Sequence, residues 1–306
     1  MYNYLICIRN FVEVVKHSSF SKAARELGIN TSQLSKQVRW LELENKSVFL
    51  ERTKKKVLLT KAGEVFFLHC QRVLADVKNM RECFDSLSDE PSGKIKFSIP
   101  LALMISPLMN IITSFLKDYP KISMELYVAN SVAKIVDGDY DMIVSAIEYH
   151  DKQVIKVPFC SLECKLFASP EYIKKKGNPK NINDLESHYL ISNRRMKGPS
   201  HTLTFLDNTK VKMPCRYTTD SNLLNIHAAK KSLGIFAASY TELYEEVSNK
   251  NLVLIDVGKK LPDISTYIYH RPVNSTSPVA IFVSYLCEHI KDLVNKVPGM
   301  SLLPQD

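Results

Sequence analysis

A short segment near the N-terminus carries side chains suited to contact a nucleic acid. Between residues 31 and 39, hydroxyl, amide and cationic groups share one side of a predicted helix: Thr31, Ser32, Gln33, Ser35, Lys36 and Arg39. Hydroxyl and amide groups can hydrogen-bond base edges in a major groove, whereas cations pair with phosphates. A run of lysines follows, at Lys54, Lys55 and Lys56. These residue types are suited to bind a polyanion and do not indicate catalysis.

The charge of the chain is concentrated in the same region. Residues 1–61 contain 12 Lys or Arg against 5 Glu and no Asp, so this part holds +7 of the formal net charge of +9. A basic segment beside a nearly neutral remainder indicates a polyanionic partner for that segment. The alternative is a basic, solvated face without a partner, and the fold has to decide between the two.

Three helices and a hairpin are predicted to position these groups. A 3.6-residue apolar period predicts a first helix that ends near His17, and serines at 18, 19 and 21 can cap a second helix that Gly28 ends. Asn30 can cap a third helix, with Gln33 as its capping-box partner. The buried face of this helix would consist of Leu34, Val38 and Leu41. Strands over 48–50 and 57–59 would carry the lysines at the tip of a wing.

A long helix is predicted after the wing, capped by Thr60 and running to about Ser88. Apolar residues recur along it at alternating intervals of four and three, namely Phe66, Cys70, Val73, Val77, Met80, Phe84 and Leu87. Such a heptad seam favours dimerisation, which would let two winged units bind two half-sites. The alternative is a helix that packs on its own domain.

The C-terminal two thirds have the pattern of an α/β protein. After a turn-rich stretch at 89–93, strands are predicted over 94–99, 123–128 and 142–146, with helices over 107–117 and 279–294. The alternation returns between residues 185 and 255. Strands that alternate with helices indicate a largely parallel sheet. Ligands of such sheets bind where strand ends meet helix N-termini, here near residues 99–101, 129–131, 145–146 and 220–222.

The chain resembles the LysR-type transcriptional regulators. The residues that carry the resemblance are 19–27 (SFSKAAREL), 34–38 (LSKQV), 41–42 (LE), 51–53 (ERT) and 59–64 (LTKAGE), with weaker cues at 93–97 (GKIKF), 136–141 (VDGDYD), 167–170 (FASP) and 232–235 (SLGI). Two departures concern the DNA-binding end. Asn30-Thr31-Ser32 replaces the family's usual Ser-Gln-Pro, which alters base-facing groups, and Asn45-Lys46 replaces its Leu-Gly, where asparagine tolerates left-handed backbone.

The resemblance implies a multidomain fold. Residues 1–61 would form a mostly α-helical winged helix-turn-helix and residues 62–90 a long linker and dimerisation helix. Residues 91–306 would form a two-lobed α/β effector-binding domain, with lobe I from 93–165 and 267–306 and lobe II from 166–266. A homodimer or homotetramer would bind inverted-repeat promoter sites in double-stranded DNA in the cytoplasm. Effector binding would move the lobes and change the DNA bend or a contact with RNA polymerase.

Two sets of site residues follow from the predicted elements and the family pattern. The DNA-binding set is Ser21, Lys22, Thr31, Ser32, Gln33, Ser35, Lys36, Arg39, Arg52, Lys54, Lys55 and Lys56. The effector set is Pro100, Leu101, Asn130, Ser131, Ser145, Ala146, Ser221 and Asn222. Family members that bind carboxylates often have Ser or Thr where this chain has Pro100, so either the effector is less anionic than usual or there is no effector.

Other function classes leave no trace in the sequence. It contains no G-x-S-x-G, H-E-x-x-H, phosphate loop or Rossmann fingerprint, so we expect neither an enzyme nor a cofactor. The seven cysteines are scattered without a C-x-x-C pair, which indicates neither a metal site nor a disulfide framework. We expect no signal peptide and no membrane span. The alternative function is a DNA-binding protein without sequence preference or effector, but the uncharged segment 31–35 on the predicted recognition face argues against it.

Overall fold

The N-terminal helices begin at capping side chains. In the computed structural model, Asn3 caps α1 (Tyr4–His17), Ser19 caps α2 (Phe20–Leu27) and Asn30 caps α3 (Thr31–Glu44). Gly28 ends α2 with left-handed backbone, at a φ of 64°. The structure describes residues 2–52, 56–85, 90–100, 103, 106–128, 132, 135, 138–193 and 201–304.

The wing and the long helix follow α3. Strand β1 (Leu50–Arg52) pairs antiparallel with β2 (Val57–Leu59), and α4 (Lys61–Asp85) begins after Thr60, whose Oγ1 accepts a 2.9 Å hydrogen bond from the Gly63 amide. The first strand starts two residues later than the sequence predicts. The reason is that Phe49 is only 3% exposed and stacks on Phe66 at 4.0 Å between ring centroids, so it belongs to the core rather than to the hairpin.

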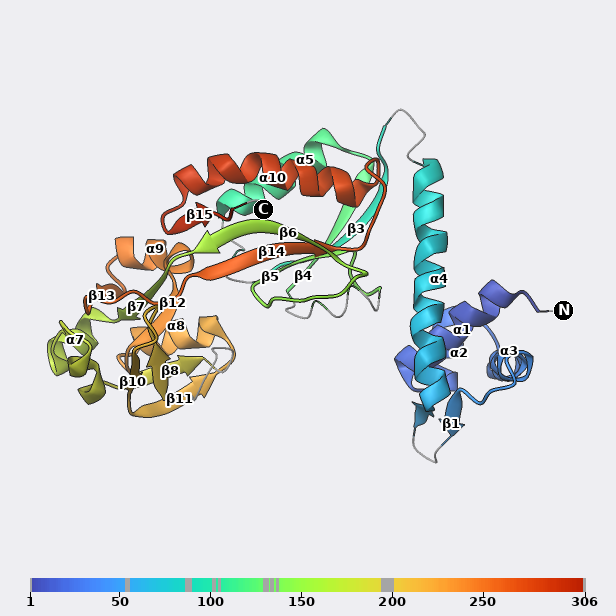
Figure 1. Cartoon of the computed structure of the whole chain (residues 1–306), viewed down its shortest axis with the longest axis horizontal. Coiled ribbons are helices and arrows are strands. Elements are labelled where there is room, and N and C mark those ends of the chain that lie inside the picture. The colour runs from blue at the N-terminus through green and yellow to red at the C-terminus, as the bar shows by residue number, and fades with distance from the viewer. Residues whose placement is uncertain are drawn as a thin grey trace.

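Lobe I is a sheet covered by helices. Its strand order is β15-β6-β14-β5-β3-β4. The elements are β3 (Gly93–Ser98), α5 (Ser106–Asp118), β4 (Ile122–Tyr127), β5 (Met142–Ser145), β6 (Ile155–Leu162), β14 (Ile264–His270), α10 (Pro278–Lys296) and β15 (Met300–Leu302). Helices α5 and α10 lie together over one face of this sheet (Figure 1), and the apolar core fills the space between them and the strands.

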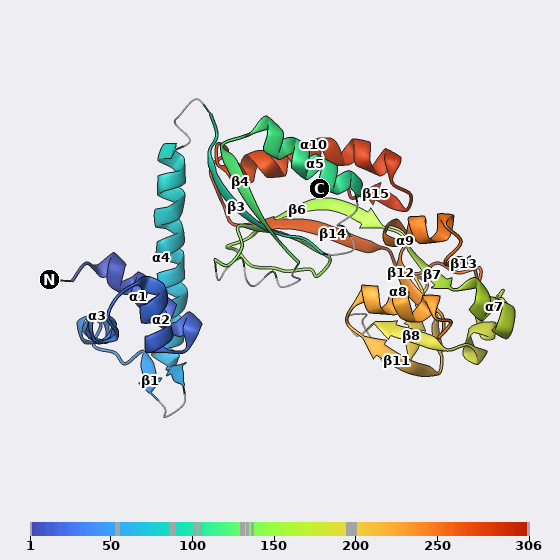
Figure 2. The same ribbon diagram turned by 180° about the vertical axis from the view of Figure 1, so that it is seen from behind.

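The expectation of a largely parallel sheet is wrong for this lobe. Strand β3 is parallel to β4 and β5, but β14 is antiparallel to both β5 and β6, and β15 is antiparallel to β6. The cause lies in the path of the chain. Strand β6 carries the chain out toward lobe II and β14 brings it back, so these neighbours run in opposite directions along the sheet (Figures 1 and 2).

Lobe II has smaller sheets and its own cores. Its elements are β7 (Cys164–Ala168), α7 (Pro170–Lys176), the 3-10 helix η2 (Asn183–Ser187), β8 (Leu190–Asn193), β9 (Thr202–Thr204), β10 (Lys210–Lys212), β11 (Cys215–Thr219), α8 (Asn222–Lys230), β12 (Phe236–Ser239), α9 (Tyr240–Ser248) and β13 (Val253–Ile255). Strand β8 is parallel to β11, whereas β7 lies between antiparallel β12 and β13. An isolated parallel bridge between Leu190 and Ile235 links β8 to the residue just before β12.

Candidate nucleic-acid interface and effector site

Helix α3 has one buried and one exposed side. Its Leu34, Val38 and Leu41 have no exposed surface (0%) and belong to the N-terminal core. Ala23 and Ala24 of α2 are also buried there, and their small side chains allow the helices to approach closely. The sequence prediction of the buried face is therefore correct, and the remaining side of α3 is left for a partner.

The predicted DNA-binding residues of α2, α3 and the wing are exposed or half-buried wherever they are described. Exposed are Ser21, Lys22, Thr31, Ser32, Gln33, Lys36, Arg39 and Lys56, while Ser35 is half-buried. Lys54, Lys55 and the side chain of Arg52 lie outside the described residues. The uncharged groups occupy the first turn of α3 and the cations the following turns, an order that suits base edges at the helix N-terminus and phosphates beyond it.

The cap of α3 differs from the prediction in one respect. Asn30 Oδ1 accepts a 2.7 Å hydrogen bond from the Ser32 amide, as expected of a cap. No hydrogen bond returns from the Gln33 side chain to Asn30 within the described part of the chain. The amide of Gln33 therefore stays in solvent, where it can contact a base.

The turn after α3 also differs. The left-handed residue is Lys46, with a φ of 49°, while Asn45 has a φ of −91°. Asn45 instead donates from Nδ2 to the Leu41 carbonyl at 2.8 Å and exchanges hydrogen bonds with the Tyr4 hydroxyl. Lysine thus takes the strained position in which the family usually has glycine, and Asn45 ties the end of α3 to the start of α1.

The first turn of α4 packs against Leu59 of the wing strand β2 and against Phe49, the residue before β1. A Cβ added to Gly63 would lie 2.0 Å from the Phe49 carbonyl oxygen, so only glycine allows this approach. Phe66 packs on the same segment by stacking on Phe49. The start of α4 and the wing therefore form one packed unit, and a movement of α4 would move the DNA-binding face with it.

The predicted heptad seam divides into two parts. Phe66 and Cys70 pack in the N-terminal core, and Cys70 is only 2% exposed. Further along the same stripe, Val73 is 40% and Met80 53% exposed, and Val77 is half-buried. Leu87 and the side chain of Phe84 lie outside the described residues. Cys70 is therefore a core residue, and the surface available to a partner is on the second half of α4.

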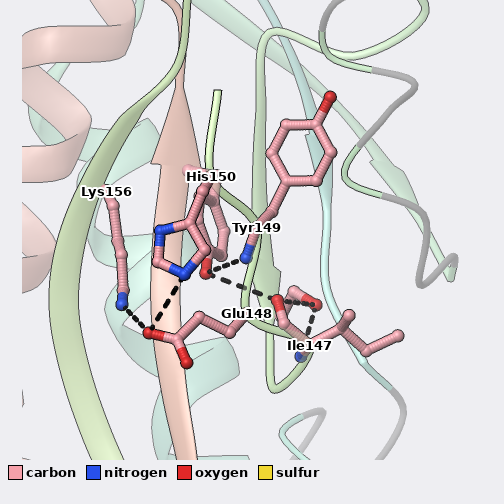
Figure 3. Close-up of polar contacts among 7 residues, drawn as sticks. Ile147, Glu148, Tyr149, His150 and Lys156 are labelled. Carbon is pink, nitrogen blue, oxygen red and sulfur yellow. Dashed lines mark hydrogen bonds and ion pairs between the residues drawn. The ribbon is translucent and has the colours of Figure 1, made fainter. Parts of the chain in front are cut away.

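In lobe I, one of the predicted effector residues proves to be buried and to have a structural role. Ser145, at the end of β5, is 1% exposed, and its Oγ accepts a hydrogen bond from the Ile147 amide at 3.0 Å. Figure 3 shows the polar contacts of Ile147 and Tyr149 in the loop that follows. Tyr269 Oη accepts from the Tyr149 amide at 3.2 Å and donates to the Ile147 carbonyl at 3.3 Å. Ser145 and Tyr269 thus hold the loop after β5, which exposes Ala146 to solvent.

The other lobe I candidates are only partly described. Pro100 is half-buried, and its carbonyl accepts a hydrogen bond from the Leu103 amide. Leu101, Asn130 and Ser131 lie outside the described residues. Proline at position 100 offers neither a hydroxyl nor an amide hydrogen, so this strand end contributes fewer polar groups than the family pattern implies.

In lobe II the predicted pair Ser221 and Asn222 lies at the start of α8. Asn222 Oδ1 accepts from Asn193 Nδ2 at 2.6 Å, and Asn222 Nδ2 donates to Glu242 Oε2 at 2.9 Å. Burial raises the pKa of the Glu242 carboxyl, and the hydrogen bond from Asn222 opposes this shift. Asn193 and Glu242 hydrogen-bond a predicted effector residue, and sequence reasoning missed both of them. The available signal was the capping-box spacing of Ser239 and Glu242 at the start of α9.

The described residues offer no metal site or activated thiol. They hold no group of three or more His, Cys, Asp or Glu side chains that could bind a metal ion. Burial raises the pKa of Cys70 and Cys164 to about 12 and that of Cys160 to about 11, which keeps these thiols protonated and poorly nucleophilic. None of the described helices is long and apolar enough to cross a membrane.

Family models match both parts of the chain. Residues 7–64 match the helix-turn-helix of bacterial regulatory proteins of the lysR family, and residues 88–291 match the LysR substrate binding domain. The first match contains α2, α3 and the wing. The second match contains most of both lobes, including the hydrogen-bonded residues Asn193, Asn222 and Glu242.

Similar proteins are found among curated sequences and solved structures. An HTH-type transcriptional regulator of Xanthomonas campestris is 29% identical over 185 residues, which are 60% of this chain and 54% of that protein. The regulator PtxR of Pseudomonas aeruginosa is 25% identical over 92% of this chain and 91% of its own length. The full-length structure of the virulence activator AphB of Vibrio cholerae has 22% identity and a TM-score of 0.61, and covers 92% of this chain and 98% of that one. The structural likeness shows the shared fold.

Proposed function

The chain belongs to the LysR family of bacterial transcriptional regulators, and from this premise we propose which of its residues perform each step. It is a sequence-specific DNA-binding regulator with a C-terminal effector-binding domain, not an enzyme. Three sets of residues carry out this function: those that contact DNA, those that form the dimer surface and those that contact the effector.

We propose that α3 enters the major groove with Thr31, Ser32 and Gln33 against base edges. Lys36 and Arg39 would contact phosphates from the following turns, together with Ser21 and Lys22 of α2. The lysines 54–56 and Arg52 would lie over the backbone beside the wing and supply affinity that depends on salt. The observation that carries this proposal is the exposed, uncharged first turn of α3 on a helix whose other side is fully buried.

We propose that dimerisation uses the second half of α4, through Val73, Val77 and Met80. Phe84 and Leu87 continue this stripe in the sequence. Two α4 helices paired in this way would present two winged domains to the two halves of an inverted-repeat promoter site. A tetramer would double this arrangement. Since its target is the chromosome of a bacterium, the protein would act in the cytoplasm.

We propose that the effector binds between the lobes, next to Pro100, Leu101, Asn130, Ser131, Ala146, Ser221 and Asn222. Ser145 would act by holding the loop that carries Ala146. Movement of the lobes would reach the DNA through α4, whose first turn is packed on the wing. The resulting change in DNA bend, or in contact with RNA polymerase, would alter transcription.

Fluorescence anisotropy tests the central step. The full-length protein is titrated with a duplex from the region upstream of its own gene and with a scrambled duplex, at two salt concentrations. A preference of about 10³-fold or more for the upstream duplex is expected of a specific regulator. Equal, strongly salt-dependent binding to that duplex, to the scrambled duplex and to a tiled genomic library would contradict specific recognition.

A further inference from the structure

Five polar residues of lobe II lie where β8 ends and where α8 and α9 begin, and hydrogen bonds join three of them. They are Asn193, Asn222, Asn225, Ser239 and Glu242. Asn193 donates to Asn222 at 2.6 Å, and Asn222 donates to the Glu242 carboxylate at 2.9 Å. The two side-chain amides thus donate in sequence, from Asn193 to Asn222 and from Asn222 to the Glu242 carboxylate. We call these five residues the polar corner.

The capping sequence of α9 is not used for capping. Ser239 and Glu242 have the spacing at which a serine hydroxyl and a glutamate carboxylate cap a helix reciprocally. Ser239 stands at the N-cap of α9 but makes no side-chain cap hydrogen bond, and Glu242 accepts from Asn222 instead. The Ser239 hydroxyl and the Glu242 carboxylate could stabilise the helix by about 1 kcal/mol as caps. Because they do not cap it, both remain available to bind another group.

The interior of the polar corner contains unsatisfied polar atoms. Asn225 and Ser239 are each 1% exposed, and the Asn225 Oδ1 and Nδ2 and the Ser239 Oγ have no hydrogen-bond partner. Asn225 follows Asn222 by one turn of α8, so both side chains lie on similar sides of the helix. Buried polar atoms without partners cost free energy and usually mark a bound water or a ligand group.

The balance of donors and acceptors identifies the chemistry that would satisfy the corner. Glu242 accepts a single hydrogen bond among the described residues, although a carboxylate can accept about four. The Asn225 carbonyl and the Ser239 hydroxyl are further acceptors, whereas Asn225 Nδ2 is a donor that an ammonium group would leave unpartnered. An ammonium group has three donors and no acceptor, and its positive charge would compensate the half-buried carboxylate. A carboxylate ligand would instead meet a like charge.

We propose that the polar corner is the subsite for a protonated amine of the effector, held by the Glu242 carboxylate, Asn225 Oδ1 and Ser239 Oγ. Asn193 and Asn222 position the carboxylate from the opposite side. The proposal rests on the proposed function, since it places one end of the effector next to Ser221 and Asn222. It agrees with Pro100 in lobe I, where family members that bind carboxylates often have a hydroxyl side chain.

Saturation-transfer NMR on the full-length protein tests this subsite with three probes of equal size: butylammonium, butyrate and butanol. Butylammonium is expected to bind in preference to the other two. Glu242→Gln keeps an acceptor for Asn222 but removes the charge, and should weaken butylammonium binding by at least about tenfold, as expected for the loss of one member of a buried charge pair. Glu245→Gln, at an exposed position of the same helix, is the matched control and should bind as the wild type does.

A second variant separates a ligand site from a structural role. Asn225→Leu removes the unpartnered amide, so it should leave the thermal midpoint unchanged or raised while it weakens butylammonium binding. Equal binding of the three probes, preferential binding of butyrate, or unchanged binding by Glu242→Gln would overturn the proposal and leave ordered water as the occupant of the corner. Promoter preference of the wild type, measured by anisotropy, tests the proposed function separately, so the two can fail independently.

Discussion

The Asn10 side-chain amide donates a 2.6 Å hydrogen bond to Gln37 Oε1 between α1 and α3. Both residues are buried, Asn10 with 2% and Gln37 with 6% of its surface exposed. Gln37 follows Gln33 by four residues on α3, so this polar contact lies one turn away from the residues proposed to contact bases. A hydrogen bond has a direction that apolar packing lacks, and this one fixes the rotation of α3 about its axis.

Loss of one partner of this contact should destabilise the N-terminal domain. Asn10→Leu leaves the Gln37 carbonyl buried without a donor, and we expect a cost of about 1–3 kcal/mol in the free energy of unfolding. The double variant Asn10→Leu/Gln37→Leu should recover part of this loss because both polar groups are gone. Urea unfolding measures the cycle, with Glu44→Gln at an exposed position of α3 as control. Additive effects in the double variant would show that the two side chains do not interact.

The recognition helix and the wing should contribute differently to DNA binding. Gln33→Ala should reduce the preference for the specific duplex by about 1–3 kcal/mol, because a base contact is lost. Lys56→Ala should weaken binding to all duplexes alike and reduce the slope of log K against log salt by about 1. Anisotropy titrations at several salt concentrations measure both quantities. If the lysine variant changed sequence preference and the glutamine variant did not, the proposed docking of α3 would be wrong.

The second half of α4 should hold the dimer together. Met80→Glu places a charge on the exposed apolar stripe, and burial of that charge against a partner helix would shift the protein to monomers. Arg72→Glu changes charge on an exposed face of the same helix, about 100° from Val73, and should leave the assembly intact. Sedimentation velocity gives the oligomeric state. If Met80→Glu still forms dimers, the dimer interface must lie on another surface of the protein.

Local sequence signals predicted much of the fold. The apolar period, Gly28, Asn30 and Thr60 placed the helices of the N-terminal domain to within a few residues, because capping and burial of one helix face are decided by neighbours in sequence. Local signals of this kind could not predict the relative direction of the strands in lobe I. Whether β14 runs parallel or antiparallel to β5 depends on the path of the chain through lobe II, which lies between them in sequence.

The candidate sites show the same limit. The exposed face of α3 follows from the period of its buried face, so the sequence predicts which residues of this helix are exposed. The role of Cys70 could not, since a heptad stripe is equally suited to a partner helix and to the core of its own domain. Glu242 was missed, although its capping-box spacing to Ser239 places it at the start of a helix. The contact actually made is with Asn222, which is 20 residues away and on another helix.

The polar corner should also reduce stability at neutral pH. Burial raises the pKa of Glu242 in the folded protein above its ordinary value of 4.5, so folding is favoured when the carboxyl is protonated. This contribution is fully present below pH 4.5 and is lost as the pH rises through the folded-state pKa. Glu242→Gln cannot ionise, so it should be more stable than the wild type at pH 7.5, and the difference should shrink as the pH falls toward 4.5. Thermal unfolding across this range measures both proteins. A variant that is less stable than the wild type at pH 7.5 would mean that other groups of the protein already stabilise the Glu242 carboxylate. The carboxylate would then gain little from a bound amine.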